Sequence, residues 1–369
     1  MSDDKDLDDI DFNNLEFDVE KFKFDVIIGN PPYQQEARGT SASDDPIYNQ
    51  FMDEAYKIAE RVAFITPARF LFNAGKTPKA WNQKMLEDEH IKVVFFEQDS
   101  SKVFSNTNIN GGVVITYRDA AQKFGAIETF VPYNELHSIC SKVSDKKENS
   151  FSKIVFGKNI YQYTDKLHDD FPEAESMLSK GHKYDVASNA FDRLDIVFSD
   201  EKPHDDKNKY FQVLGRQNNL RIYKWIRSDY IINHVSLSKH KVFVSASNGA
   251  SGTLGQKAAR MISAPIIGKP FTASTETFLT VGCFDTAEES AALYKYILSK
   301  FTRVLLGVLK VTQRNTSGTW KFVPLQNFTP SSDIDWTKSI PEIDQQLYAK
   351  YDLDDTEIAF IESHIEEMA

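Results

Sequence analysis

The sequence DVIIGNPPY at residues 25–33 is the feature that most constrains how this chain folds. The apolar run FDVIIG (24–29), bounded by a turn signal, is typical of a short strand buried on both faces. Two adjacent prolines follow, and since proline has no backbone N–H, they end the strand. Asn30, Tyr33 and a rigid stretch of carbonyls are therefore expected beyond the end of a sheet, where α/β proteins bind ligands.

Strands and helices alternate along the first third of the chain. Further short apolar runs, each typical of a strand, are VAFIT (62–66), IKVVFF (91–96) and GVVITYR (112–118). Helical spacing of apolar residues predicts helices over 46–61 and 78–89. This alternation predicts an α/β layer with a mainly parallel sheet, in which residues 112–118 could form an antiparallel edge strand.

The pattern weakens after residue 120. The polar, lysine-rich stretch 141–153 is expected to be a linker or long loop. Residues 155–330 mix short strands and turns, with one helix predicted over 287–306. The tail from residue 340 indicates one or two amphipathic helices.

Charge is distributed unevenly along the chain, whose net charge is −11. Residues 1–24 carry −6 and residues 332–369 carry −9, so the middle carries +4. The middle could therefore meet a phosphate backbone. The acidic start is neither a secretory signal nor a transit peptide, and no apolar run is long enough to span a membrane. The two cysteines and eight histidines show no metal-ligand spacing, so we expect a cytoplasmic protein without a metal.

The residue types of N-P-P-Y suit one chemical task, the activation of an amine on a flat ring. Such an amine is a poor nucleophile because its lone pair is delocalised. If the Asn30 side-chain oxygen and the Pro31 carbonyl each accept one N–H, the nitrogen becomes more tetrahedral and its lone pair points at an electrophile. Tyr33 offers a flat face for stacking, and Pro31 and Pro32 hold the acceptors in place.

These residues resemble a known catalytic motif. DVIIGNPPY is similar to the motif of S-adenosylmethionine-dependent amino-methyltransferases, and NPPY is typical of those that act on adenine N6 in DNA. VAFITPARFL (62–71) and KVFSNTNINGGVVITYR (102–118) resemble later motifs of the same enzymes. The resemblance implies that Phe104 stacks on the other face of a flipped adenine, opposite Tyr33. Base flipping is expected because the amine cannot be reached inside a duplex.

The second region also resembles one group of these enzymes, the Eco57I-like restriction–modification methylases. The similar segments are GRQNNLRIYKWI (215–226), KVFVSASNGASGTLG (241–255), ETFLTVGCF (276–284), KFVPLQNFT (321–329) and the tail at 342–362. The resemblance implies a partial Rossmann-like catalytic sheet over 1–140, a mixed α+β target-recognition domain over 150–330 and an acidic helical tail over 331–369. It makes double-stranded DNA the expected partner.

Basic and amide side chains of the middle region are candidates for contacts to phosphate or bases. Taken singly, each is more often solvated surface. The candidates are Arg216, Asn218, Arg221, Lys241, Lys257, Arg260, Lys310 and Arg314.

The sequence departs from the family pattern at the cofactor. Such enzymes bind S-adenosylmethionine at a strand followed by an F-x-G-x-G-like loop, which precedes N-P-P-Y in the group with this motif order. Here the 29 residues before Asn30 are acidic and have no glycine before Gly29. The loop with Gly249, Gly252 and Gly255 is an alternative cofactor loop, or a loop that approaches DNA. The pattern therefore indicates the C-terminal part of a methyltransferase, with the cofactor pocket completed by an N-terminal portion or a partner subunit.

Three functions remain open from the sequence. The first is a site-specific, adenine-specific DNA methyltransferase, with the activity of this chain alone left open. The second is a methyltransferase that acts on RNA or on protein glutamine amides, although the glutamine enzymes lack a large domain after the motif. The third is a non-catalytic fragment that recognises DNA or binds a partner, which the missing cofactor half favours.

Overall fold

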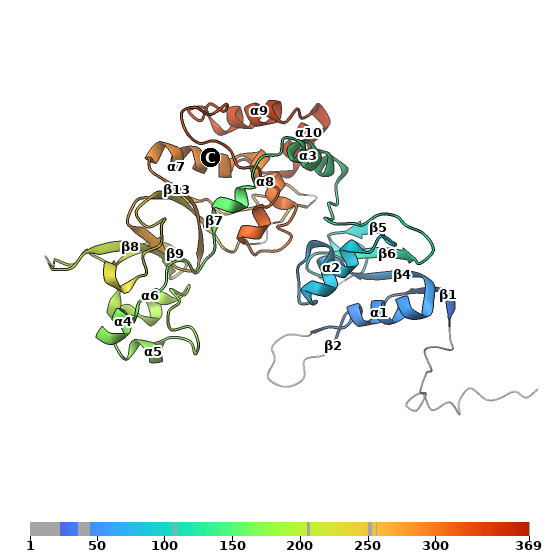
Figure 1. Cartoon of the computed structure of the whole chain (residues 1–369), viewed down its shortest axis with the longest axis horizontal. Coiled ribbons are helices and arrows are strands. Elements are labelled where there is room, and N and C mark those ends of the chain that lie inside the picture. The colour runs from blue at the N-terminus through green and yellow to red at the C-terminus, as the bar shows by residue number, and fades with distance from the viewer. Residues whose placement is uncertain are drawn as a thin grey trace, which may run out of the picture. The chain divides into compact units, whose positions relative to one another are not determined.

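The computed structural model describes residues 23–35, 45–105, 107, 109–204, 207–249, 253–255 and 257–368. The chain divides into two compact units between Phe130 and Val131 (Figure 1). The elements of the first unit are β1 (Phe24–Gly29), β2 (Gln34–Gln35), β3 (Asp45–Pro46), α1 (Tyr48–Ile58), β4 (Ala59–Pro67), the 3-10 helix η2 (Ala68–Phe72), α2 (Lys79–Glu87), β5 (Ile91–Glu97), the 3-10 helix η3 (Ser100–Lys102) and β6 (Val113–Asp119).

A four-stranded sheet with the order β1-β4-β6-β5 forms the centre of the first unit. β1 and β4 are parallel, whereas β6 is antiparallel to both β4 and β5. The predicted antiparallel direction of β6 is confirmed, but its predicted place at an edge is wrong. The apolar sequence of β6 explains the difference, because Val113, Val114 and Thr116 are buried between two neighbouring strands. Within the described strands of this sheet, parallel pairing is thus confined to β1 and β4, so the expected mainly parallel sheet is wrong.

Helix α1 packs against β4 of this sheet. Met52 and Ala55 of α1 and Met85 of α2 are buried. β1 departs from its prediction, because none of its six residues is buried. It lies at the edge of the described sheet, where it pairs with β4 alone.

The second unit begins with α3 and contains two further sheets. Its elements are α3 (Asn134–Asp145), η4 (Phe151–Ile154), β7 (Val155–Phe156), α4 (Asp165–Asp170), α5 (Ala174–Met177), α6 (Ala190–Arg193), η5 (Asp195–Val197), β8 (Tyr210–Gln217), β9 (Leu220–Arg227), η6 (Ser228–Tyr230), β10 (His240–Ser245), β11 (Ile266–Gly268), β12 (Thr272–Ser274), β13 (Phe278–Phe284), α7 (Ala287–Leu298), α8 (Lys300–Gly307), η7 (Ser317–Trp320), α9 (Ile340–Lys350) and α10 (Asp355–His364).

Two apolar cores hold the second unit together. The first joins the sheet β11-β10-β13-β7 to α3 and to helices α7–α10. The second joins the sheet β12-β8-β9 to the short helices α4–α6. The whole chain is thus a mixed α/β protein, as the sequence predicts.

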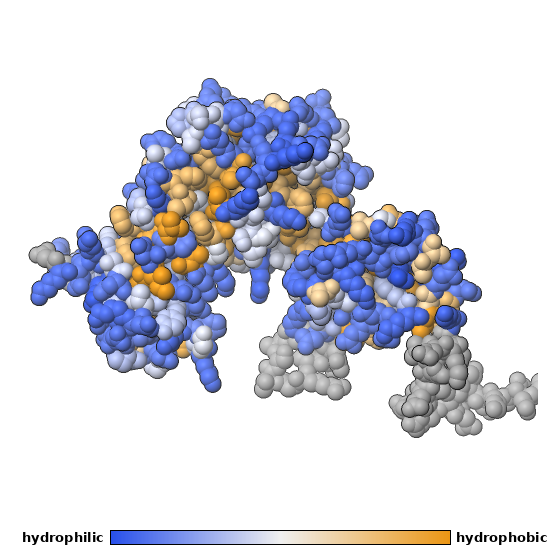
Figure 2. Space-filling view, in the orientation of Figure 1, coloured by the Kyte–Doolittle hydropathy of each residue, from blue (hydrophilic) through white to orange (hydrophobic). Residues whose placement is uncertain are grey.

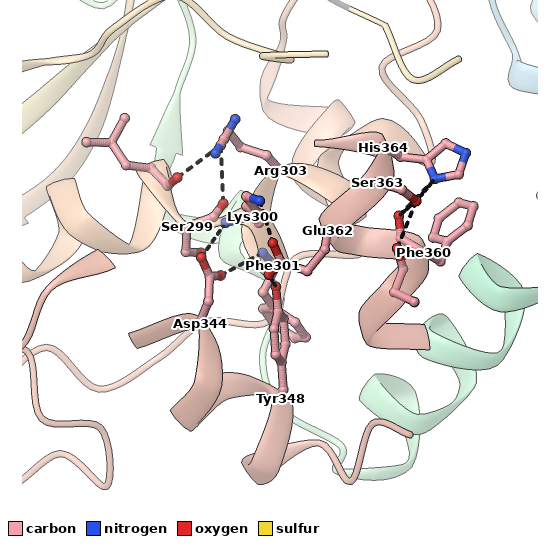
Figure 3. Close-up of polar contacts among 12 residues, drawn as sticks. Ser299, Lys300, Phe301, Arg303, Asp344, Tyr348, Phe360, Glu362, Ser363 and His364 are labelled. Carbon is pink, nitrogen blue, oxygen red and sulfur yellow. Dashed lines mark hydrogen bonds and ion pairs between the residues drawn. The ribbon is translucent and has the colours of Figure 1, made fainter. Parts of the chain in front are cut away.

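The C-terminal helices are an integral part of the first of these cores. Leu347 of α9 and Ile361 of α10 are fully buried. The carboxylate of Asp344 in α9 accepts hydrogen bonds from the backbone N–H groups of Lys300 and Phe301, both at 3.0 Å (Figure 3). Asp344 therefore caps the start of α8 and links two helices that are distant in sequence.

Two sequence boundaries differ from the structure. The stretch 141–153, expected to be a linker, contains the end of α3 and most of η4. Leu136 and Ile139 of α3 are fully buried in the core of the second unit, so residues from 131 onward lie in that unit and not in the first. The predicted helix 287–306 is two helices that meet at Ser299, whose hydroxyl accepts a hydrogen bond from the Thr302 N–H at 3.1 Å.

The described residues contain neither a membrane-spanning helix nor a metal-binding cluster. None of their helices is long and apolar enough to cross a membrane. No group of three or more His, Cys, Asp or Glu side chains in the described part of the chain could hold a metal ion.

Candidate active site

The motif N-P-P-Y follows β1 directly and is fixed to the start of α1. Pro31 is buried, while Asn30 and Pro32 are exposed. The Tyr33 carbonyl accepts a hydrogen bond from the Ile47 N–H at 3.2 Å. β2 and β3 then pair as a short antiparallel ladder, with Gln34 opposite Pro46. The carbonyls and side chains of the motif are therefore held at the carboxyl end of β1, as the two prolines predict.

A pocket of about 720 Å³ opens at this end of the sheet. Its volume is in the range of sites that bind small organic ligands. The ends of β1 and β4, the start of α1, the segment before α2 and the loop before β6 all contribute to it. It is lined by Asn30, Pro31, Pro32, Tyr33, Gln34, Pro46, Tyr48, Pro67, Arg69, Gly75, Lys76, Thr77, Thr107, Ile109 and Asn110.

Tyr33 has a hydroxyl that the described residues leave without a partner. Its oxygen is buried and forms no hydrogen bond within that part of the chain. Burial raises the pKa of Tyr33 to about 12, so the phenol is neutral at physiological pH. A buried hydroxyl without a partner loses its hydrogen bond to water on folding. An incoming polar group could restore that bond.

Phe104 lies beside Tyr33. The two ring centroids are 6.4 Å apart and the rings are inclined by 67°. This is an edge-to-face contact of the two rings with each other. Two parallel faces with room for a base between them are not present in this arrangement, so stacking of a base on both rings requires at least one ring to turn.

The loop that carries Phe104 is fixed by a buried serine. The Ser100 hydroxyl donates to the Thr107 carbonyl and accepts from the Ile109 N–H, both at 2.8 Å. The loop then returns to β6 through Gly112, whose φ is +79°. A Cβ at this position would lie 2.3 Å from the Glu97 carbonyl oxygen, so only glycine fits here.

The charge of the pocket lining is positive. Arg69 and Lys76 line the pocket, and its described lining contains no aspartate or glutamate. Arg69 Nε donates to the Asn110 carbonyl at 2.6 Å, and Lys76 pairs with Asp45 at 3.0 Å. The described lining thus offers hydrogen-bond acceptors and cations but no carboxylate base. This agrees with an amine that is activated by neutral acceptors.

Sequence reasoning missed Arg69, Lys76 and Tyr48 as pocket residues. A signal for Arg69 was present, because it follows Pro67 at the end of β4. The carboxyl ends of parallel strands meet at one edge of a sheet, so residues just after β4 had to lie near those just after β1. Tyr48 lies in α1 and Lys76 in the segment before α2. No sequence pattern indicates that these segments lie at the same edge of the sheet as N-P-P-Y.

Two of the DNA-contact candidates are wrong. The side chains of Lys241 and Lys310 are fully buried. Lys241 Nζ donates to the Ser236 carbonyl at 2.7 Å, and burial lowers the pKa of Lys241 to about 7. Lys310 Nζ donates to the Thr312 carbonyl at 3.2 Å, and burial lowers its pKa to about 8. Neither ammonium group can reach a phosphate, because each lies inside the second unit.

Three other candidates lie in the β8–β9 hairpin. Asn218 and Asn219 form its two-residue turn with φ of 50° and 62°, which is typical of a type I′ turn. Arg216 and Arg221 lie directly opposite each other on adjacent strands. Like charges at such positions repel, which favours an anionic partner. The Arg221 guanidinium also donates to the Ala264 carbonyl at 2.6 Å, so it has a structural role as well.

The remaining candidates are exposed. Lys257 and Arg314 lie at the surface of the second unit, and Arg260 pairs with Glu366 at 3.0 Å. Their exposure leaves all three side chains accessible to a partner.

The residues that the structure describes do not fit a binding site for S-adenosylmethionine. Among the described segments, no strand is followed by a glycine-rich loop and then by a helix. Of the candidate cofactor loop, Gly252 lies outside the described residues. Gly249 is in open surroundings after β10, and the next element is the three-residue strand β11. The expected helix N-terminus for a cofactor is therefore missing from this part of the chain.

Comparison with known proteins agrees with the sequence motifs. Residues 2–104, which include N-P-P-Y and Phe104, match the family model of the Eco57I restriction-modification methylase. An uncharacterized adenine-specific methylase of Mycoplasma pneumoniae is 32% identical over 149 residues, which are 38% of this chain and 35% of that protein. The chain thus spans about a third of the curated relative that it matches. The resemblance to Eco57I-like methylases is confirmed for the N-terminal part of the chain.

Two solved structures are also similar. The Type IIL restriction-modification enzyme MmeI, solved in complex with DNA, aligns over 96% of this chain and 57% of its own, at 12% identity and a TM-score of 0.44. The type IIG restriction endonuclease BpuSI aligns over 88% of this chain and 49% of its own, at 10% identity and a TM-score of 0.32.

Proposed function

We propose that this chain carries the base-binding and DNA-recognition parts of an S-adenosylmethionine-dependent DNA adenine-N6 methyltransferase of a restriction–modification system. The observation that carries this proposal is the pocket at the end of β1, where Asn30, Pro31 and Tyr33 meet Arg69 without a carboxylate in the described lining. The family match over residues 2–104 supports it. The name of the Mycoplasma pneumoniae relative supports adenine as the base.

The residues of the chain act on the acceptor amine. The Asn30 side-chain oxygen and the Pro31 carbonyl each accept one N–H of the adenine amine, which makes the nitrogen more tetrahedral and its lone pair available. Tyr33 stacks against the ring, and its buried hydroxyl gains a partner. Arg69 lies where it can neutralise a phosphate next to the flipped nucleotide. S-adenosylmethionine would supply the methyl group from a pocket completed outside the described residues.

Methylation in cells tests this proposal directly. The gene is expressed with its neighbouring genes in a bacterial host without DNA methyltransferases, and N6-methyladenine is mapped by long-read sequencing. We expect one methylated sequence motif with the wild type and none with Asn30→Ala, while purified Asn30→Ala still binds duplex DNA. Gln83→Ala, which removes an exposed amide on α2 of the same unit, serves as the matched control and should methylate like the wild type. Equal methylation by Asn30→Ala and wild type would refute the mechanism.

One observation favours a second candidate function, a DNA-binding fragment without catalysis. The described residues do not form a donor site, and the β8–β9 hairpin places two arginines side by side. Under this alternative the same host shows no methylated DNA motif, although the purified chain binds duplex DNA. A methyl mark on RNA or on protein glutamine in place of DNA would indicate the remaining alternative.

A further inference from the structure

The side chain of Arg69 lies against two glycines of the first unit. Gly75 belongs to the segment before α2 and Gly111 to the loop before β6, and both have a φ of +89°. A Cβ on Gly75 would lie 3.2 Å from Arg69 Cδ, and a Cβ on Gly111 would lie 2.8 Å from Arg69 Cγ. A side chain at either position would therefore push the aliphatic part of Arg69 aside. We call Gly75 and Gly111 the arginine slot.

Side-chain hydrogen bonds fix the segment that carries Gly75. The Thr77 hydroxyl donates to Asn82 Oδ1 at 2.6 Å, and Asn82 Nδ2 donates to Asn73 Oδ1 at 3.1 Å. Thr77 and Asn82 are buried, and Asn73 has a φ of 52°. The segment is thus tied to α2 at both of its ends, and Arg69 takes no part in these bonds.

The loop that carries Gly111 is fixed to the end of β4. The Gly112 carbonyl accepts a hydrogen bond from the Ala68 N–H at 3.0 Å. Arg69 Nε donates to the Asn110 carbonyl at 2.6 Å. The loop therefore contacts both the aliphatic part and the guanidinium of Arg69. Two fixed segments determine where this positive charge lies, before any ligand enters the pocket.

The guanidinium keeps donors that a ligand can use. The contact with Asn110 occupies Nε and leaves the N–H groups of the two terminal nitrogens for other acceptors. Arg69 lines the pocket together with Asn30 and Tyr33, and the described lining contains no carboxylate that would compete for these donors. The site thus suits an anion that enters with the substrate.

A phosphodiester is the anion that a flipped nucleotide brings with it. The nucleotide is bonded to a phosphate on each side of its sugar, so a phosphate approaches the pocket whenever the base enters it. The planar fork of an arginine matches phosphate oxygens in geometry and charge. The exposed surface of α2, which follows Gly75 in the chain, is mainly hydrophilic (Figure 2). Such a surface favours a charged backbone over an apolar partner.

We propose that the arginine slot holds Arg69 as the binding residue for a phosphodiester next to the target adenine, with Gly75 and Gly111 as positioning residues. This inference rests on the proposed function. It makes the substrate a nucleic acid, because a protein glutamine amide brings no phosphate to the pocket. Since the slot orders the side chain in advance, little conformational entropy is lost when the phosphate binds.

The first experiment removes the negative charges of the DNA one at a time. A duplex is selected from a random pool by its binding to the full chain, and each phosphate is replaced in turn by an uncharged methylphosphonate. We expect one replacement to weaken binding by the wild type about tenfold or more and to leave binding by Arg69→Ala unchanged. Equal responses of the two proteins at every phosphate would overturn the proposal.

The same duplex shows whether this phosphate adjoins the target base. Each adenine is replaced in turn by a fluorescent analogue, whose emission rises when the base leaves the stack. We expect the phosphate that responds to Arg69 to flank the one position that becomes fluorescent on binding. A responding phosphate several nucleotides away from that position would overturn the proposal.

Alanine in the arginine slot tests the positioning role. Gly111→Ala should weaken DNA binding about as much as Arg69→Ala, and the double variant should bind no worse than Arg69→Ala. Gly125→Ala is the matched control, because its φ is +91° but a Cβ there has no described atom within 4 Å. It should bind like the wild type. Additive losses in the double variant would overturn the proposal. If circular dichroism shows that Gly111→Ala does not fold, Gly75→Ala, with its longer contact, replaces it.

The carboxylate of S-adenosylmethionine is another source of oxygen acceptors for Arg69. Calorimetric titration of S-adenosylmethionine into the wild type and into Arg69→Ala distinguishes the two sources. We expect the same result with both proteins. Saturable binding that is lost in Arg69→Ala, together with unchanged binding of DNA, would place the carboxylate at Arg69 and overturn the proposal.

The readouts separate this inference from the proposed function. A phosphate that responds to Arg69 beside a flipped adenine, in a host whose DNA stays unmethylated, would support the phosphate site and refute the function. DNA methylation at the wild-type rate by Arg69→Ala would support the function and refute the phosphate site. A chain that selects no duplex at all would refute both.

Discussion

Gly112 determines the shape of the loop that forms one wall of the pocket. Its φ of +79° favours glycine, and a Cβ there would lie 2.3 Å from the Glu97 carbonyl oxygen. Gly125 has a similar φ of +91°, but a Cβ added there would have no neighbouring atom of the described residues within 4 Å. A side chain at either position strains the backbone, but only a side chain at Gly112 also clashes with a neighbouring atom. Comparing the two positions therefore distinguishes the two contributions to the free energy of unfolding.

Replacing each of these glycines by alanine tests this distinction. We expect Gly125→Ala to lower the free energy of unfolding by about 1 kcal/mol, from backbone strain alone. Gly112→Ala should lower it by about 3 kcal/mol or more, because the backbone must also move away from Glu97. Urea unfolding of the two variants, followed by tryptophan fluorescence, measures both values. Equal losses would contradict a steric role for Gly112.

The β8–β9 hairpin is the element that most resembles a nucleic-acid contact. Its type I′ turn projects Asn218, and the strands beneath it pair Arg216 with Arg221. Arg216 is the better residue for a test, because it is exposed and its hydrogen bonds to described residues stay within the same turn, to Asn219. Arg221 also donates a hydrogen bond to the Ala264 carbonyl, so its removal would disturb the fold as well.

Arg216→Ala should weaken the binding of duplex DNA. We expect a loss of about tenfold in affinity and a salt dependence reduced by about one phosphate contact. Lys166→Ala removes a lysine of α4 that pairs with Asp170, and it should leave the affinity unchanged. Fluorescence anisotropy over a series of salt concentrations measures both effects. An unchanged salt slope for Arg216→Ala would place the DNA contact elsewhere.

The cap between α9 and α8 makes the stability of the second unit depend on pH. Burial raises the pKa of Asp344 to about 6, although two backbone N–H groups and Arg303 favour its charged form. The folded pKa lies above the unfolded one, so the folded state binds the proton more tightly. The stability that this group contributes is therefore complete below about pH 4 and is lost as the pH rises through 6, by roughly 3 kcal/mol in all.

The Asp344→Asn variant isolates this contribution. The other titrating groups are the same in both proteins, so the difference in unfolding free energy between them reports on Asp344. We expect this difference to change in favour of the variant as the pH rises from 4 to 7, because the amide that replaces the carboxyl does not titrate. Urea unfolding at several pH values measures it, and a difference that does not vary with pH would contradict the raised pKa.

At the scale of the whole molecule, the two large apolar cores of the described residues lie in one of the two units. Every residue of the two large cores lies between Leu136 and Met368, inside the second unit. The first unit leaves Phe24, Val26 and Ile28 of β1 exposed, and among the described strands β1 pairs with β4 alone. The second unit thus has the properties of an independently folding domain. The exposed apolar side chains of β1 favour association of the first unit.

Separate expression of the two units tests this difference. Residues 131–369 should unfold in a single cooperative transition and stay monomeric. Residues 1–130 should bind a hydrophobic dye and aggregate, and Ile28→Lys should reduce this aggregation. Calorimetry and light scattering provide the readouts. A soluble, monomeric first unit that binds no dye would contradict the exposure of Phe24, Val26 and Ile28.

Particular elements show how far the sequence predicts this fold. The end of β1, the α/β alternation and the helical tail follow from local rules, because proline stops a strand and apolar spacing marks a helix face. The division of the predicted helix into α7 and α8 at Ser299 was not predicted, because the apolar residues continue in helical spacing across Ser299. The position of β6 between β4 and β5 was not predicted either, because strand order depends on contacts between segments that are distant along the chain.

The sequence by itself determined the motif at the end of β1 and the residue types that it presents there, because the proposed acceptors, the Asn30 side chain and the Pro31 carbonyl, are adjacent in the chain. It also determined the resemblance to Eco57I-like methylases. Only the tertiary structure decided which distant side chains join the motif and which are buried. Arg69 and Lys76 reach the pocket because separate segments return to one edge of the sheet, whereas Lys241 and Lys310 are removed from the surface by packing. Burial and proximity are properties of the folded chain, and local sequence encodes them only weakly.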